Sequence, residues 1–168
     1  FGVRVNIIVP NVSWGISIGR QTLHECDLLV LSSAGYATEV EIKVSKSDLL
    51  KDAAKPHGHL SNLIRRLYFC VPEKLQEIAL ESIPQRAGLL VGSVKTNTYY
   101  TYAKGRYEIT SPCLVEVRKP FANNKAHCWS EKERYQLARL GTMRILGLKE
   151  KLQKQHAKKA EIISKVKE

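Results

Sequence analysis

Hydrophobic and polar positions follow short, strand-like patterns through the first part of the chain. Residues 3–9 predict a strand that Pro10 stops, and residues 11–21 predict a loop. Residues 26–31 and 37–44 are β-rich and enclose a turn-like segment in which Gly35 can adopt a positive φ. We therefore expect a β-hairpin here.

Downstream, helical and strand-like patterns alternate. Ser45-Lys46-Ser47-Asp48 is typical of a helix start, and that helix should end before Pro56. A second short helix is predicted over about residues 60–66, and Pro72 can open a helix over 73–82. Further strands are predicted over residues 67–71, 88–92, 99–102 and 114–117, with a turn at 104–106. This interleaving indicates the α/β class.

After Pro120 the pattern changes to a loop over residues 121–127 and then to a long helix from Ser130. An apolar stripe near helical spacing predicts that this helix docks on the rest of the chain; it consists of Leu137, Leu140, Ile145, Leu148 and Leu152. Residues 149–168 hold seven lysines and three glutamates, which favours a solvated, projecting tail over a dedicated binding arm. We expect an α/β core over residues 1–118 and a helical extension over 119–168.

Composition restricts the class of protein. With 168 residues, 43% of them hydrophobic and 26% charged, the chain can bury one core and is neither disordered nor fibrous. It contains no apolar run long enough for a membrane span and no signal-peptide pattern, so we expect a cytoplasmic protein. The four scattered cysteines favour buried free thiols over a zinc site, although His127 and Cys128 are adjacent.

The net charge of +11 is the first functional indication. A basic surface attracts polyanions, and nucleic acid is the natural partner. The alternative is that the lysines only keep the protein soluble.

The predicted hairpin concentrates ionisable groups on one of its faces. Its even positions, from Cys26 to Val44, are almost all apolar and are expected to face the core. Its odd positions include Glu25, Asp27, Glu39, Glu41 and Lys43. A turn centred on Ala34 would set Asp27 opposite Glu41 and Glu25 opposite Lys43.

Two carboxylates facing each other about 5 Å apart repel by roughly 3 kcal/mol at an effective dielectric near 20. Either one of them takes up a proton, or a hard cation such as Mg²⁺ lies between them. The alternative, a solvent-facing sheet surface, explains Glu25 with Lys43 but not Asp27 with Glu41.

These residues resemble a known family. Asp27, a hairpin turn, Glu41-Ile42-Lys43 at the end of the second strand, and a following helix resemble the PD-(D/E)XK nuclease superfamily. A longer set of segments resembles MmcB-like nucleases predicted to act in DNA repair, and the resemblance covers roughly residues 24–92. It rests on residues 25–29 and 41–45, Asp48, Asp52, and residues 67–72 and 87–91.

The resemblance implies a restriction-endonuclease-like core, with a mixed central sheet flanked by helices. Asp27 and Glu41 would bind Mg²⁺ or Mn²⁺ with the carbonyl of Ile42 as a further ligand, and Lys43 would position or activate the attacking water. Many members also carry an acid on a preceding helix, which is not evident before residue 24. That helix could lie upstream of Phe1; otherwise supporting acids could come from Glu25, Glu39, Asp48 and Asp52.

Basic residues after the Glu41-Ile42-Lys43 motif could hold phosphates, with solvating surface charges as the alternative; they are Lys46, Lys51, Lys55, Arg65 and Arg66.

We therefore expect a metal-dependent nuclease acting on DNA in repair, recombination or defence. The first alternative is a catalytically inactive nuclease-fold module that binds nucleic acid or serves as a complex subunit. The second is an adaptor whose C-terminal helix recruits a partner protein or forms a homodimer.

Overall fold

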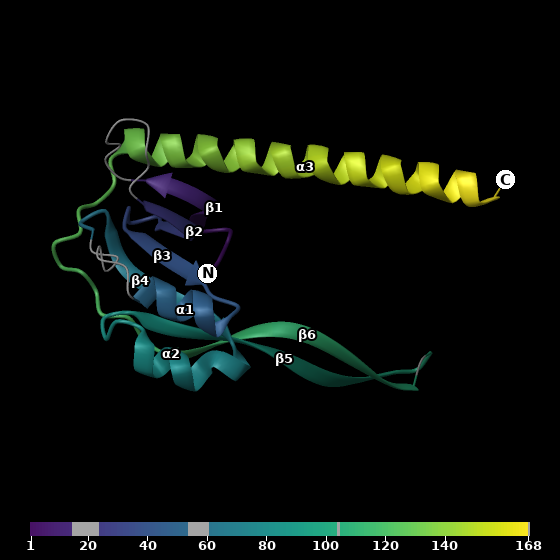
Figure 1. Cartoon of the computed structure of the whole chain (residues 1–168), viewed down its shortest axis with the longest axis horizontal. Helices are drawn as coiled ribbons and strands as arrows, with labels where there is room; N and C mark the ends of the chain where they lie inside the picture. Colours follow the sequence, from purple (N-terminus) through teal and green to yellow (C-terminus); the bar gives the residue numbers. More distant parts are fainter. Residues whose placement is uncertain (15–23, 54–60, 104, 168) are drawn as a thin grey trace.

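A six-stranded mixed sheet forms the centre of the molecule, with its strands arranged in chain order (Figure 1). The computed structural model describes residues 1–14, 24–53, 61–103 and 105–167. The strands are β1 (Asn6–Trp14), β2 (His24–Ser32), β3 (Ala37–Ile42), β4 (Ile64–Pro72), β5 (Gly88–Thr101) and β6 (Gly105–Arg118). The helices are α1 (Lys46–Ala53), the 3-10 turn η1 (Glu73–Leu75), α2 (Gln76–Ser82) and α3 (Glu131–Lys167).

Strand directions follow from the connections. Strands β1, β2 and β3 pair antiparallel, β4 runs parallel to β3, β5 runs parallel to β4, and β6 returns antiparallel to β5. Each parallel step has a helix between its strands in the chain: α1 between β3 and β4, and α2 between β4 and β5. The predicted α/β class is confirmed.

The hairpin of β2 and β3 forms in the register that a turn at Ala34 predicts. Leu28 pairs with Val40 and Leu31 with Ala37. Gly35 takes a φ of 82°, a left-handed conformation that suits glycine, and its amide donates to the carbonyl of Ser32.

Two predicted boundaries near the N-terminus were wrong. Strand β1 passes through Pro10 and continues to Trp14, whereas we expected a stop at Pro10 and a loop over residues 11–21. Residues 15–21 of that loop lie outside the described residues. Proline is tolerated here because β1 is an edge strand, and one side of an edge strand has no partner that needs an amide donor.

The short helix predicted over residues 60–66 was also wrong. Ile64, Arg65 and Arg66 belong to β4; residue 60 lies outside the described residues. Ile64 is fully buried and pairs with Ala37 of β3. The parallel pairing of a central strand therefore overrides the weak local preference for a helix.

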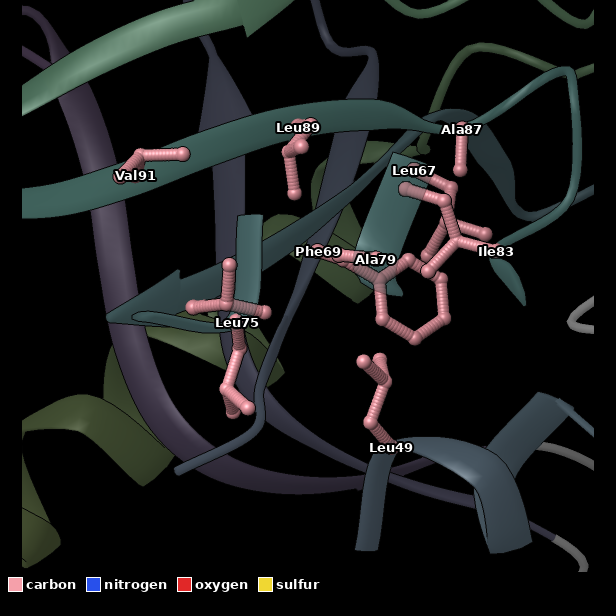
Figure 2. Close-up of a cluster of buried hydrophobic side chains, with 10 residues drawn as sticks. Leu49, Leu67, Phe69, Leu75, Ala79, Ile83, Ala87, Leu89 and Val91 are labelled. Carbon is pink, nitrogen blue, oxygen red and sulfur yellow. The ribbon is translucent and has the colours of Figure 1, made fainter. Parts of the chain in front are cut away.

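One hydrophobic core lies between the sheet and the pair α1 and α2 (Figure 2). Leu49 from α1 and Ala79 from α2 face Phe69 of β4, and Leu89 and Val91 extend this core along β5. Every one of these five side chains is buried. The packing fixes α1 against the sheet directly after β3 ends.

A second core anchors the start of α3. Trp129 and Leu137 are buried with Val9 of β1 and Leu29 of β2, and the Trp129 indole donates to the carbonyl of Leu63 (2.8 Å). Ser130 begins the helix with a reciprocal cap: its amide donates to the Glu133 carboxylate (2.7 Å), and the Glu133 amide donates to the Ser130 hydroxyl.

Only the first two residues of the apolar stripe predicted on α3 pack against the rest of the chain. Leu137 is buried and Leu140 is half-buried, but Ile145, Leu148 and Leu152 are each more than half exposed. At 37 residues the helix is about 55 Å long, and it projects well beyond strands β1 to β4 (Figure 1). No helix in the described part of the chain combines the length and low polarity that a membrane crossing requires.

All four cysteines are free, as expected, but only Cys26 is buried. Cys70 and Cys113 are half-buried, and Cys128 is exposed next to the hairpin turn, where its thiol donates to the carbonyl of Ala34.

Candidate functional site

The predicted site lies where β3 ends and α1 is about to begin. Glu41 pairs with Phe69 of the parallel strand β4. Lys43 follows the last residue of β3, and its amide donates to the carbonyl of Cys70 (2.9 Å), so the strand pairing continues through it. Because residues two apart on a strand share a face, the side chains of Glu41 and Lys43 lie on the same side of the sheet.

That side is buried at the end of β3, where we expected an open face. The even positions Cys26, Val30 and Val40 are buried as predicted, so both faces of the hairpin are covered in part. Glu39, Glu41 and Lys43 are buried, whereas Ile42 is 45% exposed and Val44 68% exposed. Helices α1 and α2 cover the face that carries Leu67 and Phe69, which pair with Glu39 and Glu41. The charged groups at the end of β3 therefore lie at the edge of the core and not on an open sheet surface.

Lys43 is the centre of a cluster of acids. Its ammonium lies 2.8 Å from Glu41 Oε2, 3.5 Å from Asp52 Oδ1 and 4.0 Å from Asp27 Oδ2. The same Asp27 Oδ2 accepts the amide of Ile42 at 2.7 Å, which ties β2 to the end of β3. Asp27, Glu41 and Lys43 thus meet as the sequence predicted, although Asp27 and Glu41 are 14 positions apart in the sequence.

Only one member of the cluster reaches solvent to a substantial degree. The side chain of Asp27 is 41% exposed, whereas those of Glu41, Lys43 and Asp52 are 3%, 7% and 1% exposed. A substrate or ion from solution would therefore first meet Asp27.

Burial changes the acidity of the central pair. Desolvation raises the pKa of Glu41 to about 7 despite the opposing hydrogen bond and charge of Lys43, and the charges of Glu39 and Asp27 add to the rise. Desolvation would lower the pKa of Lys43, but the hydrogen bond and charge of Glu41, together with Asp52 and Asp27, raise it above its ordinary value. Lys43 is therefore a cation at neutral pH, while Glu41 lies close to its titration midpoint.

The third acid comes from the helix that follows the hairpin. Asp52 belongs to α1 and is buried beside Lys43. The supporting role predicted for Asp52 thus has a structural basis in its contact with the ammonium. Asp48, one turn earlier, is exposed, and its amide is capped by the Ser45 hydroxyl (3.3 Å).

The other two candidate supporting acids lie in different surroundings. Glu25 is exposed and pairs with Ser13 of β1, and the printed pairs between β2 and β3 extend only to Leu28 and Val40, so its position opposite Lys43 stays a prediction. Glu39 is fully buried and its charge acts on Arg86, whose pKa is lowered by desolvation and partly restored by Glu39. Sequence reasoning missed Arg86, which stands in a loop with no motif around it.

The predicted phosphate-binding residues do not gather at one place. Lys46 and Lys51 are exposed on α1, close in sequence to the cluster, and Lys55 lies outside the described residues. Arg65 stacks on the ring of Tyr36 (4.1 Å), about 13 Å along β4 from Phe69. Arg66 lines a pocket with Tyr68 on the face of the sheet opposite Glu41. Their role in binding nucleic acid stays a prediction.

The donor chemistry suits a hard cation. The Asp27 and Glu41 carboxylates both lie near the Lys43 ammonium, at 4.0 Å and 2.8 Å, and Mg²⁺ commonly binds proteins through one or two carboxylates. Among the described residues no group of three His, Cys, Asp or Glu side chains is arranged as a ready-made metal site. A metal here would depend on two carboxylates and a backbone oxygen, with Lys43 beside it.

Comparisons with known proteins establish the fold and no more. The sequence matches no family model and no curated protein. The structure is similar to a solved structure titled "SPO1766 protein of unknown function from Silicibacter pomeroyi", with a TM-score of 0.50 and 18% sequence identity, over 92% of this chain and 84% of that one. At this identity the similarity indicates a shared fold.

Proposed function

We propose that this chain is a metal-dependent nuclease that hydrolyses phosphodiester bonds in DNA, with Asp27, Glu41 and Lys43 as its catalytic residues. The observation that carries the proposal is the convergence of two carboxylates on one ammonium, at 2.8 Å and 4.0 Å, at the end of β3, where Asp27 reaches solvent. Asp52 brings a third acid, so carboxyl groups outnumber the ammonium and favour a divalent cation.

Each residue has a distinct chemical task. Asp27 and Glu41 would hold Mg²⁺ or Mn²⁺, with the carbonyl of Ile42 as a further oxygen donor. Such an ion, when bound, lowers the pKa of a bound water and neutralises charge on the phosphoryl group. Lys43 would orient the attacking water and stabilise negative charge as it develops. Asp52 would act as a positioning residue that holds the Lys43 ammonium.

The local architecture agrees with the resemblance to the PD-(D/E)XK superfamily. A hairpin carries Asp27 on its first strand, Glu41-Ile42-Lys43 ends its second strand, and a helix follows. In the residues described before β2 there is no helix that could bring an additional acid, and here Asp52 comes from α1. A setting in repair, recombination or defence is part of the proposal.

The direct test is cleavage of single-stranded, duplex and branched DNA by the purified full chain with Mg²⁺ or Mn²⁺. We expect Asp27→Asn, Glu41→Gln and Lys43→Ala each to lower the cleavage rate at least about a hundredfold. Asp48→Asn is the matched control, because it removes the same charge as Asp27→Asn from an exposed acid that lies outside the cluster.

Folding must be measured in parallel because Glu41 and Lys43 are buried. Circular dichroism melting separates a misfolded variant from an inactive one, and Asp27→Asn, at a partly exposed position, should fold. Titration calorimetry with Mn²⁺ should show binding to the wild type and to Asp48→Asn but not to Asp27→Asn. A folded wild type that cuts none of these substrates and binds no metal would overturn the proposal.

One observation favours a second candidate, an inactive nuclease-fold module that binds nucleic acid. Lys43 already pairs with Glu41 and Asp52, so the buried charges are balanced in part without a metal. Salt-sensitive DNA binding in the presence of EDTA, with no cleavage when metal is restored, would identify this candidate.

A further inference from the structure

The outer half of α3, residues 145–167, extends beyond strands β1 to β4 (Figure 1). Two contacts with β1 precede this segment: Gly141, where a β-carbon would lie 3.1 Å from Val9 Cγ2, and Arg144, whose guanidinium donates to the carbonyl of Asn11 (3.0 Å). From residue 142 to residue 159 no side chain is buried. Among its described side chains this segment has no buried apolar residue that would stabilise the helix, so a binding partner would explain its form.

Its charge identifies the kind of partner. Over Glu131–Lys167 the sequence has eleven lysines and arginines against four glutamates, which is +7 out of the net +11 of the whole chain. Such a concentration of positive charge on one element is complementary to a polyanion.

Two of the lysines lie on the same face of α3 as Leu140, the face that packs on the sheet near the start of the helix. Lys151 and Lys158 follow Leu140 by eleven and eighteen residues, which is close to three and five whole turns. Both are exposed, and Leu140 itself packs against the core at the base of the helix. Lys151 and Lys158 therefore lie on the side of α3 that faces the sheet nearer its start.

We propose that the outer half of α3 is a nucleic-acid-binding arm, with Lys151 and Lys158 contacting phosphates of the DNA on which the Lys43 cluster acts. Strand β3 runs parallel to β4 and β5, and Figure 1 shows β5 and α3 projecting toward the same end of the molecule. The carboxyl end of β3, where the cluster lies, points to that end as well. A DNA segment held along the arm thus lies toward the end of the sheet at which Asp27 is exposed.

These lysine contacts to the substrate rest on the proposed nuclease function, but they can be tested by DNA binding without cleavage. Fluorescence anisotropy with a short labelled DNA duplex in EDTA, over a series of salt concentrations, measures binding alone.

The variant Lys151→Gln/Lys158→Gln removes two charges from the proposed face. Its matched control, Arg139→Gln/Lys149→Gln, removes two exposed charges from other faces; Lys149 lies two and a half turns from Leu140. Glutamine and lysine have similar helix propensities, so both variants should fold.

We expect the slope of log K against log salt to be reduced by about 2 in Lys151→Gln/Lys158→Gln and to stay near the wild-type slope in the control. Equal losses in both variants would show a diffuse charge effect and overturn the proposal. A wild type that binds no DNA at low salt would also overturn it. So would a Lys151→Gln/Lys158→Gln variant that binds DNA like the wild type and differs from it only in self-association or in binding to anionic vesicles. Retained binding in a chain that never cleaves would support the arm and reject the nuclease.

Discussion

At the scale of single residues, the Glu41 carboxyl group determines how this site responds to pH. Its pKa is about 7 in the folded protein, against an ordinary value of 4.5. Between those values the folded chain holds a proton that the unfolded chain has released, so the free energy of unfolding falls as pH rises and levels off above about pH 7. A shift of this size corresponds to about 3 kcal/mol at most.

We therefore predict that metal-free wild type loses stability between about pH 5 and pH 7.5 relative to Glu41→Gln. Urea unfolding followed by circular dichroism at each pH measures this difference. Lys43 does not contribute in this window, because its raised pKa leaves it charged in both states. Asp48→Asn is the control and should follow the wild-type curve; parallel curves for wild type and Glu41→Gln would contradict the raised pKa.

Sequence reasoning found the members of the cluster but not their environment. The turn at Ala34 set the register that brings Asp27 near Glu41, and the helix predicted between Ser45 and Pro56 includes Asp48 and Asp52, which both lie on α1. Burial of Glu39 was not predictable, because apolar residues occur on both faces of the hairpin and alternation alone does not say which face the helices cover. Only the packing of α1 and α2 decides that.

At the scale of elements, the β5 and β6 ribbon extends beyond the sheet and supports itself. Between Val94 and Pro112 no described side chain is buried; Tyr99 stacks on Tyr107 (5.7 Å between ring centroids) and Thr96 bonds to Thr110 (3.0 Å). The base of β5, by contrast, carries Leu89 and Val91 into the core.

We predict that replacing residues 94–112 with Asn-Gly, a two-residue turn between the paired residues Ser93 and Cys113, changes the free energy of unfolding by less than about 1 kcal/mol. Such a paired ribbon is marginally stable alone and adds little to the core, and Asn-Gly suits a tight hairpin turn. Leu89→Ala on the same strand is the contrast and should cost about 2–5 kcal/mol. A loss of several kcal/mol in the shortened chain would show that the ribbon packs on another part of the molecule.

Elements with a strong local signal were predictable, and those decided by their neighbours were not. The capped start of α3 and the glycine turn of the hairpin follow from Ser130 and Gly35. The passage of β1 through Pro10 depends on its edge position, and the strand at Ile64 depends on pairing with β3. Neither condition is visible in a local window of sequence.

At the scale of the whole molecule, the basic charge is concentrated away from the core. Residues 148–168 contain seven lysines and three glutamates, so ending the chain after Gly147 takes the net charge from +11 to +7. The contacts that anchor α3, those of Trp129, Leu137, Gly141 and Arg144, all remain in the shortened chain.

We predict that this truncation leaves the unfolding midpoint nearly unchanged and lowers the affinity for duplex DNA at least about tenfold near 0.1 M salt, because several phosphate contacts are lost together. Thermal melting and anisotropy in EDTA measure the two effects on the same preparation. A truncated protein that unfolds would mean that the outer half of α3 stabilises the fold through contacts in solution. One that binds DNA like the full chain would place the binding surface on the sheet and its helices, and the helix would then have to serve another partner.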